Sequence, residues 1–339
     1  MTYVRDAWYV AGWTPDLPRD APSAISILGE PVVLWWADGV LRAHEDRCLH
    51  RLAPLSSGRC EGASLRCMYH GLLYDAEGLC IEIPGQDKIP DGARIRSYPV
   101  VDRHSWAWVW MGDPALADPA LIPPAVGFDD PDYILGRGFL DYAAEARLIN
   151  DNLLDFSHLT YVHAASFQAT GVFADSLPKI TPLERGIRVE RWVTDAPGLP
   201  QRGGSGPADV WSTYDFLIPG VLLMTGGNFP VGTAQASNFG PPDFALVEGG
   251  TTFTSQAVTP TGDGTARYFF SWGPHRNHGD EAMRDALMEV AAMAFAEDKA
   301  MIEGQQRIID ATPDPRIMPT VHDKGVTIFN RLVERLAAA

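Results

Sequence analysis

Residues 48–70 read CLHRLAPLSSGRCEGASLRCMYH, and this stretch decides the fold of the first part of the chain. It contains two compact pairs of metal-binding side chains: Cys48 with His50, and Cys67 with His70. Two thiolates and two imidazoles suit either a zinc ion or a [2Fe–2S] cluster that has cysteines on one iron and histidines on the other. Structural zinc sites usually space their first pair by two to four residues, so the single residue between Cys48 and His50 favours the cluster.

The other two cysteines, Cys60 and Cys80, have no histidine at ligand spacing, and we expect both to be ordinary thiols. Four cysteines in 339 residues are too few for a disulfide framework. Metal or cluster chemistry in the cytoplasm is therefore the expected use of the cysteines. The N-terminus has no apolar segment of the kind found in secretory signals, which agrees with that location.

Charge and composition exclude several classes of partner. The chain has 27 basic and 43 acidic residues, and its net charge of −16 repels nucleic acid and anionic lipid alike. Apolar residues make up 46% of the chain without any run of eighteen, which is typical of a soluble globular protein with no membrane span. A length of 339 residues predicts two domains, each large enough for its own core.

Short alternating segments dominate the first hundred residues and indicate a small antiparallel β domain. Turn-forming pairs such as Asp38-Gly39 and Glu77-Gly78 separate them. The expected strands are Ala24–Leu28, Val32–Trp36, Val40–Ala43, Leu72–Tyr74, Arg94–Val101 and Trp106–Met111. Residues 112–131 are rich in Asp, Pro and Ala, so we place a boundary near residue 115, which gives domains 1–115 and 116–339.

The second part of the chain reads as a run of strands followed by a long helix. This order predicts an α+β domain with the helix laid on one face of an antiparallel sheet. The expected strands are Gly186–Val193, Val210–Leu217, Val221–Thr225, Thr251–Thr259 and Thr265–Trp272, and Tyr133–Arg147 is expected to be a strand that leads into a helix over Leu148–Asp155. The last clear element is a helix over Glu281–Ile309.

A second group of metal-binding side chains lies in residues 152–163, NLLDFSHLTYVH. On a helix, Asn152, Asp155 and His158 would share one face, and their apolar neighbours indicate that this face points into the protein. Buried polar groups need partners or a metal. Two histidines and one carboxylate form the facial triad of non-haem Fe(II) sites, so His158 and His163 are candidate ligands, with the carboxylate supplied by Asp155 or from elsewhere.

The long C-terminal helix offers the other carboxylate. Its expected apolar stripe consists of Met283, Leu287, Val290, Ala291, Ala294 and Met301. Asp298 falls inside this stripe, whereas Glu297 lies nearer its edge. A carboxylate on a buried stripe is costly unless it is paired or bound to a metal. From periodicity alone, a salt bridge between Asp298 and a basic residue is as acceptable as metal binding.

The two constellations, in this order, resemble the Rieske non-haem iron oxygenases, and among them the single-subunit-type aromatic O-demethylases. The resemblance covers most of the chain. Its stretches are Ala7–Val10, Cys48–Ser56, Tyr69–Gly71, Val109–Asp113, Asp151–His163 and Ala296–Asp298. The chain departs from the family pattern at Leu49, where the family usually has proline, and at Met68; neither change removes a ligand.

The resemblance implies a role for each candidate residue. Cys48, His50, Cys67 and His70 become the ligands of a Rieske-type [2Fe–2S] cluster, and His158, His163 and Asp298 become the ligands of a mononuclear Fe(II). Asp155 takes the family's bridging role, accepting hydrogen bonds from His158 and from the His70 imidazole of the next subunit. Asn152 lies beside the iron. The implied fold is an antiparallel β Rieske domain followed by a helix-grip-like catalytic domain.

The function implied is that of the terminal oxygenase of a monooxygenase system that O-demethylates a methoxylated aromatic acid with release of formaldehyde. Its partners would be dioxygen, a small aromatic substrate, a flavin and iron–sulfur reductase, and two more copies of the chain in a homotrimer. Asn228, Gln256 and Trp272 are candidates for the substrate pocket, although ordinary sheet positions explain them equally well.

Three alternatives stay open at this point. The same iron site can hydroxylate an aryl methyl group or an aromatic ring, or remove an N-methyl group. A pure electron carrier would need only the first constellation. A zinc-stapled protein that binds aromatic compounds would have no redox activity at all.

Overall fold

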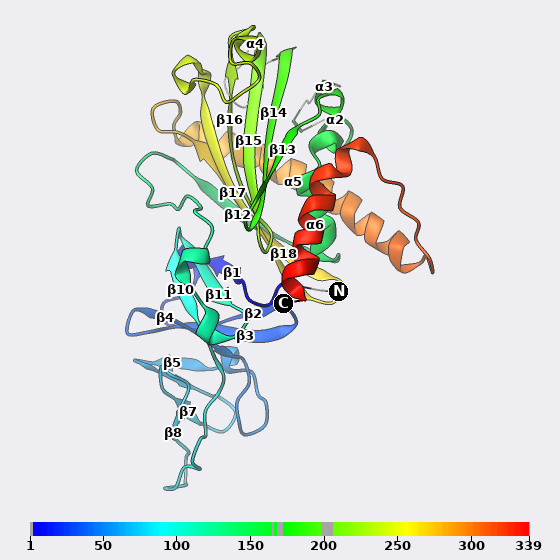
Figure 1. Cartoon of the computed structure of the whole chain (residues 1–339). Coiled ribbons are helices and arrows are strands. Elements are labelled where there is room, and N and C mark those ends of the chain that lie inside the picture. The colour runs from blue at the N-terminus through cyan, green and yellow to red at the C-terminus, as the bar shows by residue number, and fades with distance from the viewer. Residues whose placement is uncertain (1–2, 165, 168–171, 198–205, 339) are drawn as a thin grey trace. The chain divides into compact units, whose positions relative to one another are not determined.

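The computed structural model describes residues 3–164, 166–167, 172–197 and 206–338 (Figure 1). Its internal contacts divide the chain into two compact units. The N-terminal unit is Arg5–Ile122 together with Thr259–Asp263, and the C-terminal unit consists mainly of Pro123–Val258 and Gly264–Ala339. The cut expected near residue 115 stays a prediction. In the described part of the chain, the helices are too short or too polar to cross a membrane.

The N-terminal unit is built from small antiparallel sheets. The first has the order β1 (Trp8–Trp13), β11 (Trp106–Trp110) and β10 (Val100–Arg103). The second has the order β2 (Ser23–Ile27), β3 (Glu30–Ala37), β4 (Val40–Glu45) and β9 (Ser97–Tyr98). The third has the order β5 (Arg59–Glu61), β6 (Ser64–Arg66), β7 (Leu73–Tyr74) and β8 (Cys80–Glu82). The expected antiparallel β domain is therefore confirmed.

Strand β1 was missed from the sequence. All six of its residues are buried, so it lacks the alternation of polar and apolar residues by which a half-buried strand is identified. Its tryptophans pack onto those of β11: the rings of Trp8 and Trp110 are 5.4 Å apart, and those of Trp13 and Trp106 are 4.7 Å apart. The expected strand over Arg94–Val101 is in fact parts of two short strands, β9 and β10.

The C-terminal unit contains a large antiparallel sheet whose strand order is β12-β18-β17-β16-β15-β14-β13. The strands are β12 (Gly136–Tyr142), β13 (Lys179–Leu183), β14 (Gly186–Pro197), β15 (Pro207–Leu217), β16 (Val221–Phe229), β17 (Glu248–Gly262) and β18 (Thr265–Pro274). From β13 to β18, strands that are consecutive in sequence are neighbours in the sheet. The exception is β12, the first strand in sequence, which lies at the edge beside β18, the last. The predicted α+β class is confirmed.

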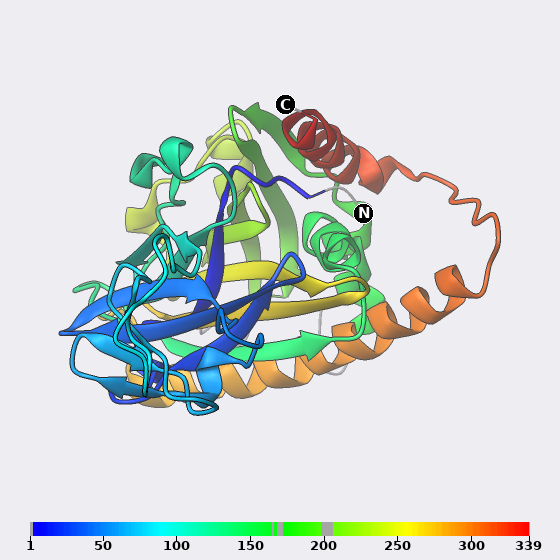
Figure 2. The same ribbon diagram turned by 90° about the horizontal axis from the view of Figure 1, so that it is seen from below.

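Two long helices cover one face of this sheet. Figure 2 shows α5 (Glu281–Asp310) running along β12 and β18, and α6 (Lys324–Ala337) lying beside β13 and β14. The ring of Phe329 on α6 contacts Phe216 of β15 at 4.7 Å, and Phe295 on α5 contacts Phe270 of β18 at 4.8 Å. Helix α5 begins at the predicted residue and ends one residue beyond the predicted end, whereas α6 was not predicted.

The segment that carries the second group of polar residues is not one helix. Helix α1 (Ala146–Leu154) ends before Asp155, whose backbone is extended, with φ −125° and ψ 98°. The Asp155 side chain then accepts a hydrogen bond from Ser157 N at 2.8 Å and caps the next turn, Phe156–His158, which leads into α2 (Leu159–Val162). The expectation that Asn152, Asp155 and His158 share one helical face is therefore wrong, because a capping aspartate favours a break in the helix over its interior.

Candidate metal centres

The two Cys/His loops of the N-terminal unit share one hydrogen-bond frame. In residues 48–53, Cys48 N donates to Ala53 O at 2.8 Å and Leu52 N donates to Cys48 O at 2.9 Å. In residues 67–72, Cys67 N donates to Leu72 O at 2.8 Å and Gly71 N donates to Cys67 O at 3.0 Å. Each loop is thus closed at the same two offsets from its cysteine. The fifth residue is left-handed in both, with φ +57° at Leu52 and +78° at Gly71.

This frame brings the four candidate cluster residues to one end of the unit. Cys48 and Cys67 are buried, whereas His50 and His70 are exposed, with ring centroids 4.4 Å apart. Two buried sulfurs and two solvent-facing imidazoles on paired loops fit a cluster with cysteines on its inner iron and histidines on its outer one. Cys60 and Cys80 are free thiols that lie outside both loops, as expected.

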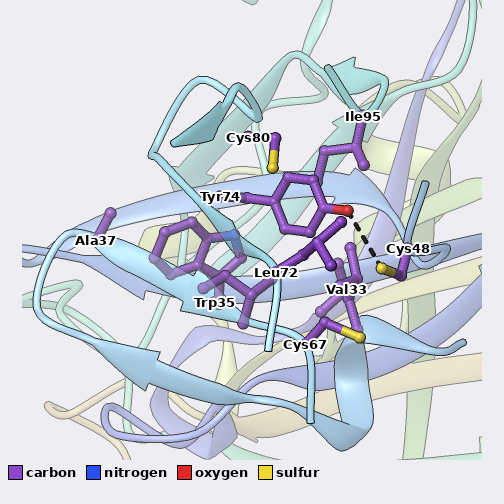
Figure 3. Close-up of a cluster of buried hydrophobic side chains, with 11 residues drawn as sticks. Val33, Trp35, Ala37, Cys48, Cys67, Leu72, Tyr74, Cys80 and Ile95 are labelled. Atoms are coloured by element: carbon purple, nitrogen blue, oxygen red, sulfur yellow. Dashed lines mark hydrogen bonds between the residues drawn. The ribbon is translucent and has the colours of Figure 1, made fainter. Parts of the chain in front are cut away.

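Tyr74 on β7 contacts the first cysteine, a feature that the sequence analysis missed. Its phenolic oxygen lies 3.2 Å from Cys48 Sγ and accepts a hydrogen bond from Leu49 N at 3.1 Å (Figure 3). Burial raises the pKa of the Cys67 thiol, and the neighbouring Cys48 thiol raises it further, while backbone hydrogen bonds from Tyr69 and His70 act against the rise. Figure 3 also shows Cys80 near the Tyr74 ring, packed in the apolar core of the unit.

Four apolar side chains are exposed around the two histidines. They are Leu49, Leu52, Met68 and Tyr69, all from the two loops. The Tyr69 ring lies 4.0 Å from that of His70. Four exposed loop side chains are thus apolar where solvent would favour polar ones, which is typical of a contact surface.

The C-terminal unit gathers a second donor set. One ligand atom from each of His158, His163 and Asp298 lies within 4.8 Å of the others. Asp298 Oδ1 is 3.5 Å from His158 Nε2 and 3.2 Å from His163 Nε2. Asn152 Nδ2 donates to the same Asp298 oxygen at 3.0 Å and lies 3.4 Å from His158 Nε2. Asp155 contributes no ligand atom to this set among the described residues, so the carboxylate comes from α5.

Hydrogen bonds fix which nitrogen of each histidine faces the donor set. His158 Nδ1 lies 2.5 Å from the main-chain oxygen of Asp155. A carbonyl oxygen only accepts, so Nδ1 carries the hydrogen and Nε2 keeps its lone pair. His163 Nδ1 donates in the same way to Glu297 Oε2 at 2.9 Å. Both Nε2 atoms are therefore free to bind a metal beside Asp298.

These contacts change one expectation for Asp155. The hydrogen bond from His158 was expected on the Asp155 carboxylate, but in the structure it is made to the main-chain carbonyl oxygen. The carboxylate Oδ1 accepts from Ser157 N instead. A change of the Asp155 side chain therefore leaves the group that orients His158 in place.

The two histidines respond differently to their surroundings. Burial lowers the pKa of His158 and outweighs the nearby Asp298 charge. Burial also lowers the pKa of His163, but hydrogen bonds to Asp298 and Glu297 outweigh it, so that this pKa is raised overall. Two imidazoles whose Nε2 atoms converge on a carboxylate oxygen match the donor set of a mononuclear Fe(II) site.

The burial of α5 explains how Asp298 reaches this site. The buried positions of the helix are Leu287, Ala291, Ala294, Asp298, Ile302 and Gln306. Asp298 lies on the buried stripe as expected, but Met301, which the sequence analysis also placed there, is exposed. Beyond Ala294 the buried stripe advances in steps of four residues, so it includes Ile302 and leaves Met301 outside. Glu297 and Ser166 were missed; the one signal for Glu297 is its position next to Asp298.

Comparison with known proteins follows the same division. Residues 7–99 match the Rieske [2Fe-2S] domain, and residues 142–339 match the vanillate O-demethylase oxygenase C-terminal domain. The chain is 36% identical to the toluene-4-sulfonate monooxygenase system iron–sulfur subunit of Comamonas testosteroni, over 99% of this chain and 98% of that one. It is 34% identical to the vanillate O-demethylase oxygenase subunit of Pseudomonas sp. strain HR199, over 99% and 96%. A crystal structure of dicamba monooxygenase bound to 3,6-dichlorosalicylic acid superposes with a TM-score of 0.89 at 30% identity, covering 100% of this chain and 98% of that chain.

Proposed function

Because the chain belongs to the Rieske oxygenases whose catalytic domain is of the vanillate O-demethylase oxygenase type, we propose that it removes the methyl group of a methoxylated aromatic acid. Family membership makes it the terminal component of a monooxygenase system with a [2Fe–2S] cluster and a mononuclear Fe(II). The observation that carries the proposal is the convergence of His158, His163 and Asp298 within a domain of that type.

The roles of the individual residues belong to this proposal. Cys48, His50, Cys67 and His70 hold the cluster, and His158, His163 and Asp298 hold the iron. The paired loops and the converging Nε2 atoms support these assignments. Asn152 directs its amide to Asp298 and keeps that carboxylate turned towards the histidines. The cluster domain is taken as residues 1–115 and the catalytic domain as 116–339.

The reaction inserts one oxygen atom into a methyl C–H bond. When bound, the iron supplies a position where dioxygen is activated with two external electrons. The substrate methyl ether, dioxygen, two electrons and two protons give a hemiacetal and water. The hemiacetal then breaks its C–O bond to yield formaldehyde and a phenol. The chain contributes position: its residues must hold the methyl carbon next to the iron and keep bulk water away.

The pocket is assigned to the helix-facing side of the large sheet. Strand register places Gln256 opposite Leu222 and Asn228 opposite Val210, on the face that carries Phe216. Gln256 is buried, and among the described residues its Oε1 has no hydrogen-bond partner. Trp272 lies on the same side, because its ring is 6.2 Å from Phe167 and Phe167 is 5.1 Å from His163.

A buried amide oxygen without a partner favours a ligand that donates a hydrogen bond to it. The aromatic wall beside it suits a substituted benzene ring. Gln256, Asn228 and Trp272 are therefore proposed to hold the aromatic acid.

Electrons reach the chain from outside. Rieske oxygenase components work with a reductase, and here we propose one that contains flavin and an iron–sulfur centre. The exposed apolar loop residues around His50 and His70 support a contact between subunits in a homotrimer, with Asp155 as the bridge from this chain's iron site to His70 of the next subunit. A cytoplasmic location is supported by the cysteines, since Cys48, Cys60, Cys67 and Cys80 form no disulfide.

The test is a product analysis with purified oxygenase, a compatible reductase and reduced nicotinamide. Methoxybenzoates and methoxyphenoxy acids should give formaldehyde and the phenol in equal amounts, with one dioxygen consumed per formaldehyde. Matched substrates that carry a methyl group directly on the ring, such as 4-methylbenzenesulfonate, should react more slowly. Turnover only of the ring-methyl compounds, or ring-hydroxylated products without formaldehyde, would replace O-demethylation by the alternative hydroxylation.

A further inference from the structure

From the contacts of His163 we propose that Glu297 is a positioning residue of the mononuclear site, which holds the His163 imidazole in ligating orientation with the help of Ser166. The proposal rests on the iron site of the proposed function but not on the identity of the substrate. It concerns a residue that does not touch the metal position itself: Glu297 meets the far nitrogen of the ring.

Consecutive residues of α5 contact opposite sides of one imidazole. Glu297 Oε2 lies 2.9 Å from His163 Nδ1, and Asp298 Oδ1 lies 3.2 Å from His163 Nε2. The ring is almost completely buried, with 1% of its side chain exposed. A buried ring whose Nδ1 donates to a carboxylate cannot flip without breaking that charge-assisted hydrogen bond and turning Nε2 away from Asp298.

Ser166 orients the Glu297 carboxylate, which in turn orients the His163 ring. Its hydroxyl donates to the same atom, Glu297 Oε2, at 2.6 Å. One oxygen thus accepts from both His163 Nδ1 and Ser166 Oγ, which leaves the Glu297 side chain a single orientation. Ser166 lies three residues after His163, so the loop that follows the histidine also supplies the support for its partner. The rings of His163 and Phe167 also pack in a T-shaped arrangement, with centroids 5.1 Å apart.

His158 shows why this arrangement matters. Its Nδ1 is oriented by the main-chain oxygen of Asp155, a group that no substitution removes. His163 depends on a side chain for the same purpose. Partners of this kind raise the basicity of a ligating imidazole, and their loss typically lowers metal affinity by about 10–100-fold. A substitution can therefore remove the group that orients His163, but not the group that orients His158.

The experiment measures metal binding, not turnover. Protein with an intact cluster but without mononuclear iron is titrated with Co(II), and binding is followed by the visible bands of tetrahedral or five-coordinate Co(II). We expect Glu297→Ala to weaken Co(II) binding by about 10–100-fold. Glu297→Gln keeps an oxygen that accepts from Nδ1 but loses the charge, so its affinity should lie between those of Glu297→Ala and the unchanged protein. Ser166→Ala should weaken binding by a few-fold.

Glu289→Ala is the matched control. Glu289 lies on the same helix, is exposed, and carries the same side chain two turns before Glu297. It should leave both the Co(II) affinity and the Co(II) bands unchanged. Equal affinities of Glu297→Ala and the unchanged protein would overturn the proposal, and so would an equal loss in Glu289→Ala. If Glu297→Ala does not fold, Glu297→Gln and Ser166→Ala carry the test, and unchanged affinity in both rejects it.

This outcome is separate from that of the proposed function. If the chain binds Co(II) with the expected order of affinities but releases no formaldehyde from any methoxy compound, the substrate assignment fails and the role of Glu297 stands. If formaldehyde appears but the order of affinities is lost, only the role of Glu297 fails.

Discussion

The phenolic oxygen of Tyr74 lies 3.2 Å from Cys48 Sγ and is itself held by the amide of Leu49 (Figure 3). With Leu49 N donating to this oxygen, the Tyr74 hydroxyl is free to donate to the sulfur. A hydrogen bond to a cluster thiolate favours the reduced, more negative state. We therefore expect Tyr74→Phe to retain the cluster but to lower its reduction potential by tens of millivolts, as measured by a redox titration of the visible spectrum.

Tyr98→Phe is the control for this change. Tyr98 lies in the same unit, and its hydroxyl donates to Glu30 rather than to a cluster residue. Its removal should leave the potential unchanged. An unaltered potential in Tyr74→Phe, or equal shifts in both variants, would show that the Tyr74 hydroxyl does not act on the sulfur.

The two left-handed residues of the paired loops, Leu52 and Gly71, should tolerate different substitutions. A Cβ on Gly71 would lie 2.8 Å from Pro84 Cγ, at a φ of +78° that disfavours any side chain. Gly71→Ala should therefore lower the free energy of unfolding by about 1–2 kcal/mol and speed the loss of the cluster. Leu52→Gly relieves the same backbone strain and should be tolerated. Thermal unfolding and cluster absorbance measure both, and the reverse order of stabilities would contradict the shared frame.

Removal of the α5 carboxylate should separate the two metal centres. Asp298→Ala leaves His158 and His163 without the oxygen on which their Nε2 atoms converge. We expect loss of mononuclear iron and of turnover, with the absorption of the cluster unchanged. Metal analysis combined with a sulfide assay checks this. Loss of the cluster together with the iron would mean that the two centres do not assemble independently.

Asp155→Asn tests the bridge between subunits. The main-chain oxygen that orients His158 is untouched by this change, so both metal centres should assemble. Cluster absorption should stay intact while turnover is blocked, because the proposed carboxylate link to the next subunit's His70 is lost. Single-turnover reduction kinetics would locate the block between the centres. Normal coupled activity in this variant would refute the bridge.

His44 should make the stability of the N-terminal unit depend on pH. Burial lowers the pKa of His44 to about 4. The charges of Arg42 and Arg94 also lower this pKa, whereas the charge of Asp75 opposes the change. Trp35 Nε1 donates a hydrogen bond to His44 Nδ1. An unfolded histidine has a pKa near 6.5, so the unfolded state binds the extra proton first. The free energy of unfolding should therefore fall as the pH drops from 6.5 towards 4, by about 3 kcal/mol at most.

His44→Gln checks this dependence, because glutamine can still accept from Trp35 but does not titrate. Urea unfolding at pH 7 and pH 5 should show a smaller loss of stability for the variant than for the unchanged protein. Equal losses at pH 5 would assign the dependence to other groups.

Elements were predicted correctly where the pattern of polar and apolar residues shows which face of the strand or helix is buried. Strands β2 and β4 and helix α5 were found because alternation or a 3.6-residue stripe marks them. Strand β3 is a continuous buried apolar run, and the turn-forming pair Asp38-Gly39 marked its end. Strand β1 is buried on both faces and shows no alternation, and α6 was missed even though its Phe329 anchors it to the sheet. The break at Asp155 depends on a capping hydrogen bond that periodicity does not reveal.

The candidate site shows the same limit. His158 and His163 are close in sequence, so their convergence was predictable from spacing. Asp298 lies on a distant helix, and periodicity alone left metal binding and a salt bridge equally acceptable; the resemblance to a known family decided between them. Glu297 was placed near the edge of the apolar stripe and passed over, because its partner His163 comes from another part of the chain.

The frame of residues 48–53 and 67–72 is closed by main-chain atoms alone, apart from the cysteines that give each loop its sulfur. The residues between these anchor points face outward, and they include His50 and His70. The apolar side chains of Leu49, Met68 and Tyr69 can therefore change where the loops meet other proteins, while the main-chain frame, the cysteines and the two histidines are kept. Because the same main-chain hydrogen bonds close both loops, the protein that delivers electrons can change without a change in the cluster site.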